Sequence, residues 1–588
     1  MRYHALACDY DGTLARNGRV EPETVEVLER LSRAGVKLLM VTGRELEDLL
    51  AVFPHAGVFD LVVAENGGLL YDPAQRHAEP LADAPPPDLA ERLRAEGVSP
   101  LGVGRVLVAT RTPYDVQVLA AIRDLGLELQ VIYNKGAVMV LPPGVNKASG
   151  LAAAVERLEL SPRSVVAVGD AENDHAFLTA AECGAAVANA LPSLKDTCDV
   201  RLAGEAGAGV TELAGLMLSG ELDAVEVPRR HILLGDDGGG GDGDGGGGGG
   251  GGEVRLPPYG VGMMVAGPSG SGKSTVTTAL LERLVGAGYQ CVIVDPEGDY
   301  ADYPGVIVLG DPERVPAVEE VLHALRLPDQ SVVVNLIGLR LRDRPAYFAE
   351  LLPRLASLRA GLGHPHWVVV DEVHHVMPAE LRHVPLHAAG DVGSLLMITV
   401  HPDAVSPAAL RLMTSVLAVG RDPTATLAAF ATAAGYDPPR AGSPRDGDVA
   451  LWRVGTEAAR RVTPAPGEVE RTRHRRKYAA GTMSKDKSFY FTGAEGRLRL
   501  RARNLHTFVE LAEGVDDETW LHHLRRGDYS TWIRESLGDA DLAEEVAAAE
   551  RDCREDAESG RRRIAGLIAD RYTLPAEPTD YDPDHDDT

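Results

Sequence analysis

The stretch ALACDYDGTLA, residues 5–15, contains a short apolar run that ends where two aspartates, Asp9 and Asp11, begin. An apolar run followed by a glycine-containing turn predicts a buried strand. Side chains two residues apart point to the same side of an extended chain, so both carboxylates face one way at the end of this strand. Like charges held this close repel each other. The pattern therefore predicts a positive charge that is bound close to both carboxylates.

Three more polar groups follow in order, each beside a predicted strand. Thr42 closes the run VKLLMVTG, and Lys147 opens a helical pattern in VNKASGL. Asp170 ends the run SVVAVGD, and Asp174 shares its face if a helix begins there. Short apolar runs that alternate with helical patterns are typical of βαβ units, whose parallel sheet carries its active loops at the carboxyl ends of the strands. The sequence thus predicts an α/β domain with these groups at one edge.

The ordered motifs DYDGT, MVTGR, VNKASGL and GDAENDHAFL make residues 1–225 resemble the haloacid dehalogenase-like phosphatases. The resemblance implies a Rossmann-like parallel sheet and a phosphoric monoester hydrolase. The long gap between Thr42 and Lys147 leaves room for an inserted cap at about residues 75–140. Such an insertion is similar to the α+β C2 cap of the type IIB members, which include Cof-like and sucrose-phosphate phosphatases. A structural acidic cluster is the alternative, and the four-part match disfavours it.

A bound divalent cation would make the paired carboxylates tolerable, and an oxygen-rich site suits Mg²⁺. By the resemblance, Asp9 attacks phosphorus to form an aspartyl-phosphate, while Asp11 protonates the leaving group and later activates water. The expected metal ligands here are Asp9, Asp11 through its carbonyl, Asp170 and, in support, Asp174. The expected phosphate contacts are Thr42, Gly43, Lys147 and Asn173, of which Thr42 and Lys147 also stabilise the developing charge.

The cap is expected to choose the substrate, a small phosphorylated metabolite with sugar phosphates among the candidates. Arg105, Arg111 and Lys135 could grip a phosphate or a carboxylate, but ordinary surface charge is the favoured interpretation of each. The sequence leaves the substrate open.

A second motif, GPSGSGKS at residues 267–274, matches the P-loop pattern between an apolar strand and a helical pattern. Backbone N–H groups of such a loop wrap phosphates at a helix N-terminus. Lys273 would reach the β- and γ-phosphates, and Ser274 would coordinate Mg²⁺. The expected ATP contacts are Gly267, Pro268, Ser269, Gly270, Ser271, Gly272, Lys273, Ser274 and Thr275. A second α/β domain is predicted for residues 253–463.

The run HWVVVDEV indicates the reaction at this second site. Asp371 ends a predicted strand and would hold the metal, and Glu372 can activate water, which favours ATP hydrolysis over transfer to a small acceptor. The segments VIVDPEGDY and VVVDEVHHVMP resemble the HerA/FtsK-type ATPases. That resemblance implies Thr399 and His401 near the γ-phosphate, Arg421 as a candidate arginine finger, and a homo-oligomer.

Two groups of histidines invite a metal or catalytic interpretation that the pattern disfavours. His374 and His375 are adjacent, so on a strand they face opposite ways and are better interpreted as polar residues near the nucleotide. Farther on, His522, His523 and Asp528 lie close to two tryptophans, which favours packing over chemistry.

The remaining segments complete the predicted organisation. The run of glycines and aspartates at residues 238–252 predicts a flexible linker over residues 226–252. Residues 464–575 predict a mostly helical domain, and the acidic residues 576–588 predict a disordered tail.

The composition limits the kinds of molecule that the protein is expected to bind. The formal net charge of −28 disfavours nucleic acid, whose one plausible footprint is the basic stretches 471–477 and 497–503, which are better interpreted as solvated faces. The five scattered cysteines include no CxxC pair, so neither a zinc knuckle nor a disulfide framework is expected. No apolar run is long enough to span a bilayer, and a cytoplasmic protein without membrane contact is expected.

Three functions stay open at this point. The leading one is a Mg²⁺-dependent phosphatase joined to an ATPase. The second is a phosphatase–kinase pair that acts on one metabolite or on nucleic-acid ends. The third is a nucleotide-sensing assembly without turnover.

Overall fold

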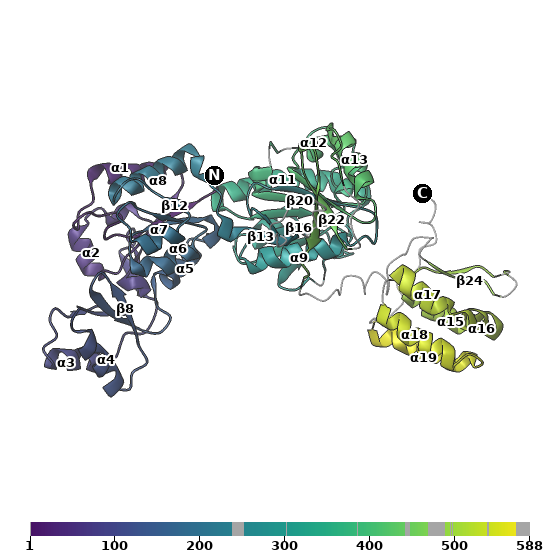
Figure 1. Ribbon diagram of the computed structural model, residues 1–588, viewed down its shortest axis with the longest axis horizontal. Helices are drawn as coiled ribbons and strands as arrows, with labels where there is room; N and C mark the ends of the chain where they lie inside the picture. The colour runs from purple at the N-terminus through teal and green to yellow at the C-terminus, as the bar shows by residue number, and fades with distance from the viewer. Residues whose placement is uncertain are drawn as a thin grey trace, which may run out of the picture. The chain divides into compact units, whose positions relative to one another are not determined.

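The computed structural model describes residues 2–237, 252–301, 303–384, 386–387, 389–441, 447–467, 488–493, 496, 498–537 and 540–571 (Figure 1). The chain divides into two compact units, residues 1–298 with 305–468 and residues 469–588 with 299–304. The first unit contains two large sheets and a small one, and the second is mostly helical. The predicted fold class is therefore confirmed.

The first sheet has eight strands in the order β12-β11-β10-β1-β2-β3-β4-β5. Its parallel strands are β1 (Ala5–Cys8), β2 (Lys37–Val41), β3 (Leu61–Ala64), β10 (Val165–Gly169), β11 (Cys183–Ala186) and β12 (Val200–Arg201), and its antiparallel edge strands are β4 (Leu69–Asp72) and β5 (His77–Pro80). The helices around it are α1 (Pro22–Arg33), α2 (Leu46–Val52), α5 (Lys147–Arg157), α6 (His175–Ala180), α7 (Pro192–Thr197) and α8 (Gly207–Ser219). α1 and α8 pack together on one face, and α5 and α6 on the other (Figure 1). The central strands are apolar throughout because both faces are covered.

The cap is a four-stranded antiparallel sheet with the order β6-β7-β9-β8. Its elements are α3 (Pro87–Ala95), β6 (Gly102–Val103), β7 (Val108–Arg111), α4 (Asp115–Asp124), β8 (Gln130–Asn134) and β9 (Ala137–Leu141). Leu89, Val118 and Val140 are fully buried in a small core of its own. The insertion begins later than expected, because β5 still belongs to the first sheet.

The second sheet has eleven strands in the order β14-β13-β23-β22-β21-β15-β20-β19-β16-β18-β17. Its parallel strands are β15 (Gly262–Ala266), β16 (Cys291–Asp295), β17 (Val306–Leu309), β18 (Ser331–Asn335), β19 (Trp367–Val370), β20 (Ser394–Thr399) and β21 (Ser415–Val419). The antiparallel strands are β13 (Ile232–Asp236), β14 (Glu253–Leu256), β22 (Val449–Arg453) and β23 (Arg460–Pro464). Its main helices are α9 (Lys273–Gly286), α10 (Val318–Ala324), α11 (Arg344–Leu362), α12 (Pro407–Leu410) and α13 (Pro423–Ala434).

The prediction of a linker over residues 226–252 was wrong in one respect. β13 lies inside that stretch and pairs with β14 on one side and β23 on the other. The glycine run therefore joins two paired strands of one sheet, and residues 238–251 lie outside the described residues. The apolar residues ILLG before the glycines are typical of a strand. They were assigned to the linker because the glycine run follows so closely. The chain passes from the first sheet to the second through residues 220–231.

The amino ends of the two sheets are in contact. Ser164, just before β10, donates its hydroxyl to the carbonyl of Gly363 at 3.2 Å. Tyr289, just before β16, donates its hydroxyl to the carboxylate of Glu182 at 3.0 Å, and Glu182 directly precedes β11. The carboxyl ends of the parallel strands in both sheets therefore lie away from this contact.

The second unit is built on an aromatic core. Its elements are β24 (Phe489–Phe491), β25 (Leu500–Ala502), α15 (Leu505–Gly514), α16 (Asp517–Arg526), α17 (Asp528–Trp532), α18 (Ala540–Asp552) and α19 (Ala557–Arg571). Trp520 stacks on Tyr529 with ring centroids 4.4 Å apart, and Phe491 and Phe508 stack nearby. The predicted tail at residues 576–588 lies outside the described residues. In the parts of the chain that the structure describes, no helix is both long and apolar enough to cross a bilayer.

Candidate functional site

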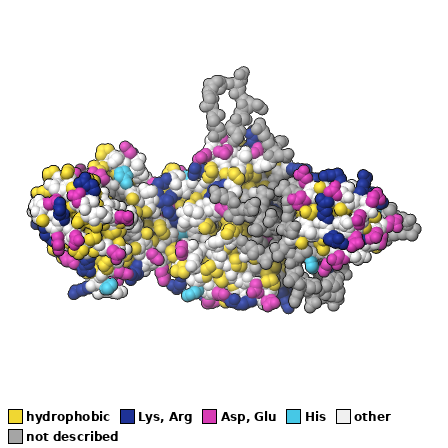
Figure 2. Space-filling view, turned by 90° about the horizontal axis from the view of Figure 1, so that it is seen from below, with side chains coloured by type: hydrophobic (Ala, Val, Ile, Leu, Met, Phe, Trp, Pro, Cys, Tyr) yellow, Lys and Arg dark blue, Asp and Glu magenta, His cyan; other side chains and the backbone are white. Residues whose placement is uncertain are grey.

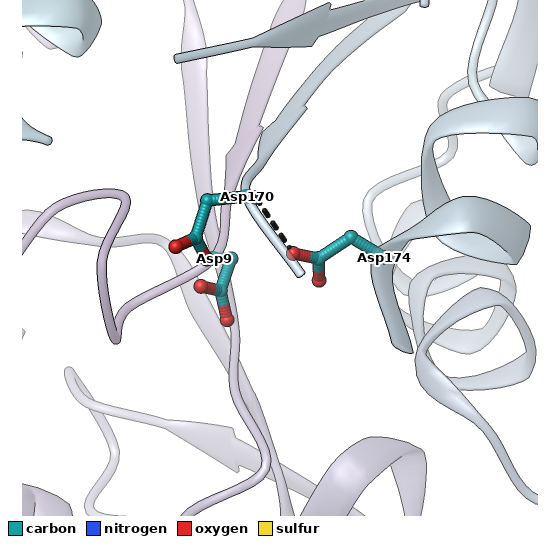
Figure 3. Close-up of side chains that lie close together, drawn as sticks. All are labelled: Asp9, Asp170 and Asp174. Atoms are coloured by element: carbon teal, nitrogen blue, oxygen red, sulfur yellow. Dashed lines mark hydrogen bonds between the residues drawn. The ribbon is translucent and has the colours of Figure 1, made fainter. Parts of the chain in front are cut away.

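Three buried carboxylates meet at the carboxyl edge of the first sheet (Figure 3). Asp9 follows β1, and Asp170 follows the neighbouring parallel strand β10, in which Val168 is the partner of Cys8. One oxygen of each of Asp9, Asp170 and Asp174 lies within 4.8 Å of the others. All three side chains are buried. In the described residues this is the one group of three or more acidic, histidine or cysteine side chains close enough to share a metal ion.

Lys147 is the buried cation of this cluster. It opens α5, where Asn146 caps the helix by accepting from the backbone N–H groups of Ala148 and Ser149. Its ammonium donates to Asp9 Oδ1 at 2.5 Å and to Asp174 Oδ1 at 2.6 Å. Burial alone would lower the pKa of Lys147, but the two carboxylates raise it, so the ammonium stays charged.

Asp174 holds the loop that carries Asp170. Its Oδ2 accepts from the backbone N–H groups of Asp170 at 2.8 Å and Ala171 at 2.9 Å, and the first of these bonds is drawn in Figure 3. Its other oxygen accepts from Lys147. Asp174 thus orients both the loop and the lysine.

The environment of Asp9 opposes the ionisation of its carboxyl group. Burial, together with the neighbouring charges of Asp174 and Asp170, raises its pKa to about 7, although Lys147 opposes the shift. Burial also raises the pKa of Asp170, against the effect of Lys135. A cation bound among these oxygens would lower both pKa values, because an opposite charge favours the ionised carboxylate.

Asp11 is paired with Arg44, a residue for which no role was predicted from the sequence. The guanidinium donates to both carboxylate oxygens of Asp11, at 2.6 and 2.8 Å, and also to Asp48. Arg44 ends the motif MVTGR, so its position next to Thr42 was the available signal. A bidentate pair of this kind fixes the orientation of the carboxylate.

The expected phosphate contacts lie on neighbouring loops. Thr42 is fully buried at the end of β2, and a Cβ placed on Gly43 would lie 3.8 Å from Asn173 Nδ2. Asn173 Nδ2 donates to Asn66 Oδ1 at 2.9 Å. Asn66, which follows β3 with a left-handed φ of 55°, was missed because its motif ENG reads only as a turn.

One cap residue reaches the carboxylates. Lys135 donates to Asp170 Oδ2 at 2.6 Å and lies 3.3 Å from the carbonyl oxygen of Asp11. The interpretation of Lys135 as ordinary surface charge was therefore wrong. Arg105 instead pairs with Glu47, and Arg111 is exposed.

The second site lies at the carboxyl edge of the second sheet. Ala266 pairs with Thr399, so Gly267 of the P-loop follows at the level of the end of β20. Asp371 follows β19, and Asp295 ends the neighbouring β16. The strand β20 lies between the P-loop strand and the strand that carries Asp371. Asp295, fully buried, had no role in the sequence interpretation.

The P-loop has the backbone that its glycines permit. Gly267, Gly270 and Gly272 have φ values of 156°, 76° and 99°. Lys273 is buried and donates to the carbonyls of Gly267 at 2.8 Å and Pro268 at 3.0 Å. The other loop members are Ser269 and Ser271, and Ser274 and Thr275 lie in the first turn of α9.

A polar group joins β19 and β20 beside the P-loop. His374 Nδ1 lies 3.2 Å from Thr399 Oγ1 and 3.5 Å from a carboxylate oxygen of Glu372. The backbone N–H of His401 donates to the same hydroxyl of Thr399. Glu372 has a left-handed φ of 37°, a conformation that costs energy in a residue with a Cβ.

Two further candidates lie at the margin of this site. His375 approaches Arg344 at 3.4 Å, so it points to a different partner from His374. Arg421, the candidate arginine finger, is exposed just after β21.

The histidine candidate of the second unit is structural. His523 Nδ1 lies 2.8 Å from Asp528 Oδ2, and Nε2 accepts from the backbone N–H of Thr492. Both ring nitrogens are thus engaged within a core that includes Trp520.

Only part of the two basic stretches belongs to the described residues. Residues 471–477 and Arg497 lie outside the described residues, and Arg499 covers the ring of Tyr490. Among the described residues on the face shown in Figure 2, Asp and Glu side chains are interspersed with Lys and Arg.

Comparisons with known proteins match two parts of the chain. Residues 6–88 and 109–213 match the family model described as haloacid dehalogenase-like hydrolase, and residues 263–347 match that of the helicase HerA central domain. A phosphoglycolate phosphatase of Methanothermobacter thermautotrophicus is 34% identical over 217 residues, which are 35% of this chain and 96% of that protein. A phosphoglycolate phosphatase of Pyrobaculum neutrophilum is 31% identical over 226 residues, 37% of this chain and 98% of that protein. A solved haloacid dehalogenase-like hydrolase from Bacteroides thetaiotaomicron is 19% identical, covering 37% of this chain and 99% of its own, with a TM-score of 0.33.

Proposed function

Through residues 6–213 the chain belongs to the haloacid dehalogenase-like hydrolases, and we propose that this part is a Mg²⁺-dependent phosphomonoesterase that works through an aspartyl-phosphate. The observation that carries the proposal is the placement of Asp9. Its carboxylate is buried at the end of β1, bonded to Lys147 and close to Asp170. A nucleophile in such a place has its charge compensated and is kept away from bulk water.

The residues present suit Mg²⁺. The donors available are carboxylate and carbonyl oxygens, namely Asp9, Asp170 and the carbonyl of Asp11, and hard oxygen donors are the ligands that Mg²⁺ takes. The pKa of Asp9, raised to about 7 by burial and by its acidic neighbours, indicates an excess of negative charge that a cation would balance. When bound, Mg²⁺ would supply positive charge to the oxygens of the transferring phosphoryl group.

The chain's own groups divide the remaining work. Asp9 attacks phosphorus, and Lys147 stabilises the charge that develops on the phosphoryl oxygens. The hydroxyl of Thr42 and the backbone N–H of Gly43 bind the phosphate, with Asn173 beside them. Asp11, oriented by its pair with Arg44, gives a proton to the leaving oxygen and then takes one from water.

We propose that the substrate is a small phosphate ester with a second negative charge, of which 2-phosphoglycolate is the simplest. Support comes from the curated relatives, which are named phosphoglycolate phosphatases, and from the cap lysine at the site. The sugar part of a sugar phosphate is uncharged and would offer this lysine no carboxylate.

The test is phosphate release by the purified full chain with Mg²⁺, from 2-phosphoglycolate and from glucose 6-phosphate. We expect 2-phosphoglycolate to be preferred, and we expect Asp9→Asn to lower kcat by roughly 10³-fold or more. Asp196→Asn, at an exposed carboxylate far along the chain, is the control. Full activity of Asp9→Asn would exclude the aspartyl-phosphate route.

The second domain is a HerA-like, ATPase-type P-loop domain, and we propose that it hydrolyses ATP. Lys273 and Ser274 would hold the phosphates and Mg²⁺, Asp371 would support the metal, and Glu372 would activate water. ATP consumption should disappear in Lys273→Ala and persist in Asp9→Asn. ATP binding that Lys273→Ala abolishes, without any turnover in the wild type, would favour the nucleotide-sensing alternative. Phosphate transfer from ATP to an acceptor would favour the kinase.

A further inference from the structure

The cap presents one ammonium group to the catalytic carboxylates. Lys135 lies in the two-residue turn between β8, which ends at Asn134, and β9, which begins at Ala137. Its Nζ contacts Asp170 Oδ2 and the carbonyl oxygen of Asp11, at 2.6 and 3.3 Å. These are two of the oxygens proposed to hold Mg²⁺.

The turn is built to aim this side chain. Lys135 and Gly136 have φ values of 47° and 85°, the pair of left-handed residues that a tight hairpin turn requires. Glycine, asparagine or aspartate usually occupies the first of these positions, because a Cβ makes it costly. The backbone N–H of Thr112 also donates to the carbonyl of Gly136 at 2.9 Å, which ties the turn to the end of β7. Strain of this kind tends to be kept where it serves a site.

The core side of the contact leaves room for the lysine. Gly12 has a φ of 90°, and a Cβ there would lie 2.2 Å from Asp170 Oδ2 and 2.8 Å from Lys135 Nζ. The glycine of the DYDGT motif thus permits both the carboxylate and the cap ammonium to occupy this space.

We propose that Lys135 and Mg²⁺ exclude each other at Asp170, and that the metal releases Lys135 to bind the second anionic group of the substrate. The exclusion follows from the position of the ammonium, which contacts both Asp170 Oδ2 and the carbonyl oxygen of Asp11, where a divalent ion bound to those two atoms would have to lie. Two cations at such short distance would also repel each other. In contact with Asp170, the Lys135 side chain is already half-exposed, so its ammonium is within reach of a bound ligand. A carboxylate on that leaving group is the partner of matching charge.

This inference rests on the proposed phosphatase function and has a test that does not depend on turnover. Mn²⁺ binding to the full chain is measured by electron paramagnetic resonance in the wild type, Lys135→Met and Lys135→Arg. Removal of the competing ammonium should lower the Kd of Lys135→Met by several-fold to about tenfold. Lys135→Arg should stay closer to the wild type. Arg105→Met, which removes a cap cation paired with Glu47, is the matched control and should not change the Kd.

The substrate half of the proposal is tested by a ratio. The kcat/KM for 2-phosphoglycolate divided by that for phenyl phosphate, which lacks a carboxylate, should fall about tenfold or more in Lys135→Met, mainly through KM. Unchanged or weaker Mn²⁺ binding would overturn the exclusion, and an unchanged ratio would overturn the role in specificity. A wild type that hydrolyses neither ester would overturn the proposed function and the substrate half together, while the Mn²⁺ measurement would still decide the exclusion.

Discussion

Two buried charged clusters lie at opposite ends of the first sheet, and they are built in opposite ways. At the carboxyl end, three carboxylates lie together with one buried lysine, Lys147, which donates to two of them. At the amino end, one carboxylate, Glu182, faces three guanidinium groups and the hydroxyl of Tyr289; the guanidinium groups belong to Arg2, Arg163 and Arg230. The acidic cluster has an excess of negative charge that calls for a cation from outside the chain. The basic cluster satisfies its carboxylate completely from within, and joins two sheets.

The largest expected effect comes from removing the lysine of the acidic cluster. Lys147→Met leaves Asp9 and Asp174 without their buried cation, so kcat should fall by about 10²–10⁴-fold. Without added metal, stability should fall by about 3–5 kcal/mol, as when a buried ion pair loses one partner. Thermal unfolding in EDTA and in Mg²⁺ measures this. If Mg²⁺ fails to restore part of the lost stability, the three carboxylates do not have the excess negative charge that would bind a cation.

The next effect should come from the basic cluster. Glu182→Gln leaves three guanidinium groups without a carboxylate, and stability should fall by about 3 kcal/mol. Phosphatase kcat should change little, because Glu182 lies at the far end of the strands from Asp9. Asp196→Asn breaks an exposed pair with Arg201 and should change stability by less than about 0.5 kcal/mol. A large loss of kcat at temperatures where Glu182→Gln is folded would show that the two ends are not independent.

The two ends should also respond to pH with opposite sign. Burial, followed by the charge of Arg359, lowers the pKa of His4 to about 4 at the amino end. At pH values between this pKa and the ordinary histidine pKa of about 6.5, His4 is protonated in the unfolded chain and neutral in the folded chain. The free energy of unfolding should therefore be highest above about pH 6.5 and should decline by up to about 3 kcal/mol as the pH falls toward 4. The raised pKa of Asp9 acts in reverse, because without metal its stability contribution is lost as pH rises from about 4 through 7.

His4→Gln isolates the first of these effects. Gln can still donate to the carbonyl of Ala360, which His4 Nε2 approaches at 3.2 Å, but it does not titrate. The urea midpoint of the wild type should therefore fall relative to His4→Gln between pH 7 and pH 5. Parallel midpoints over that range would show that His4 is not held neutral.

The smallest effect should come from one hydrogen bond between the sheets. Ser164→Ala removes the hydroxyl that donates to the carbonyl of Gly363, and stability should fall by about 1 kcal/mol. Thr211→Ala, which removes a hydroxyl bonded within α8, is a matched control for the general cost of losing such a bond. A loss that equals the control would mean that the contact between the sheets adds nothing specific.

The acidic cluster was largely predictable from the sequence, because parallel strands bring their carboxyl ends together. Asp9, Lys147, Asp170 and Asp174 follow or face such ends, so their motifs predicted their meeting. Lys135 was not predictable in this way. Its position depends on how the cap turn approaches the core, and a lysine in the letters YNKGA looks like any exposed turn residue.

The basic cluster gave no signal in the sequence. Glu182 and Tyr289 are separated by more than a hundred residues, and neither belongs to a recognisable motif. Their contact depends on the packing of two sheets through their amino ends. β13 was missed for a related reason, since its strand partners come from distant segments as well as from across the glycines.

The contact between the sheets at their amino ends has a consequence for how the two proposed reactions could influence each other. At about 3.3 Å per residue, strands of four or five residues place each reactive edge roughly 15 Å from the shared base, on opposite sides of it. A product released at one edge would leave on the side that faces away from the contact between the sheets, and diffusion through the surrounding water would carry it to the other edge. Within the chain, an influence of ATP turnover on ester cleavage would pass through this base as a displacement of the residues that contact each other there.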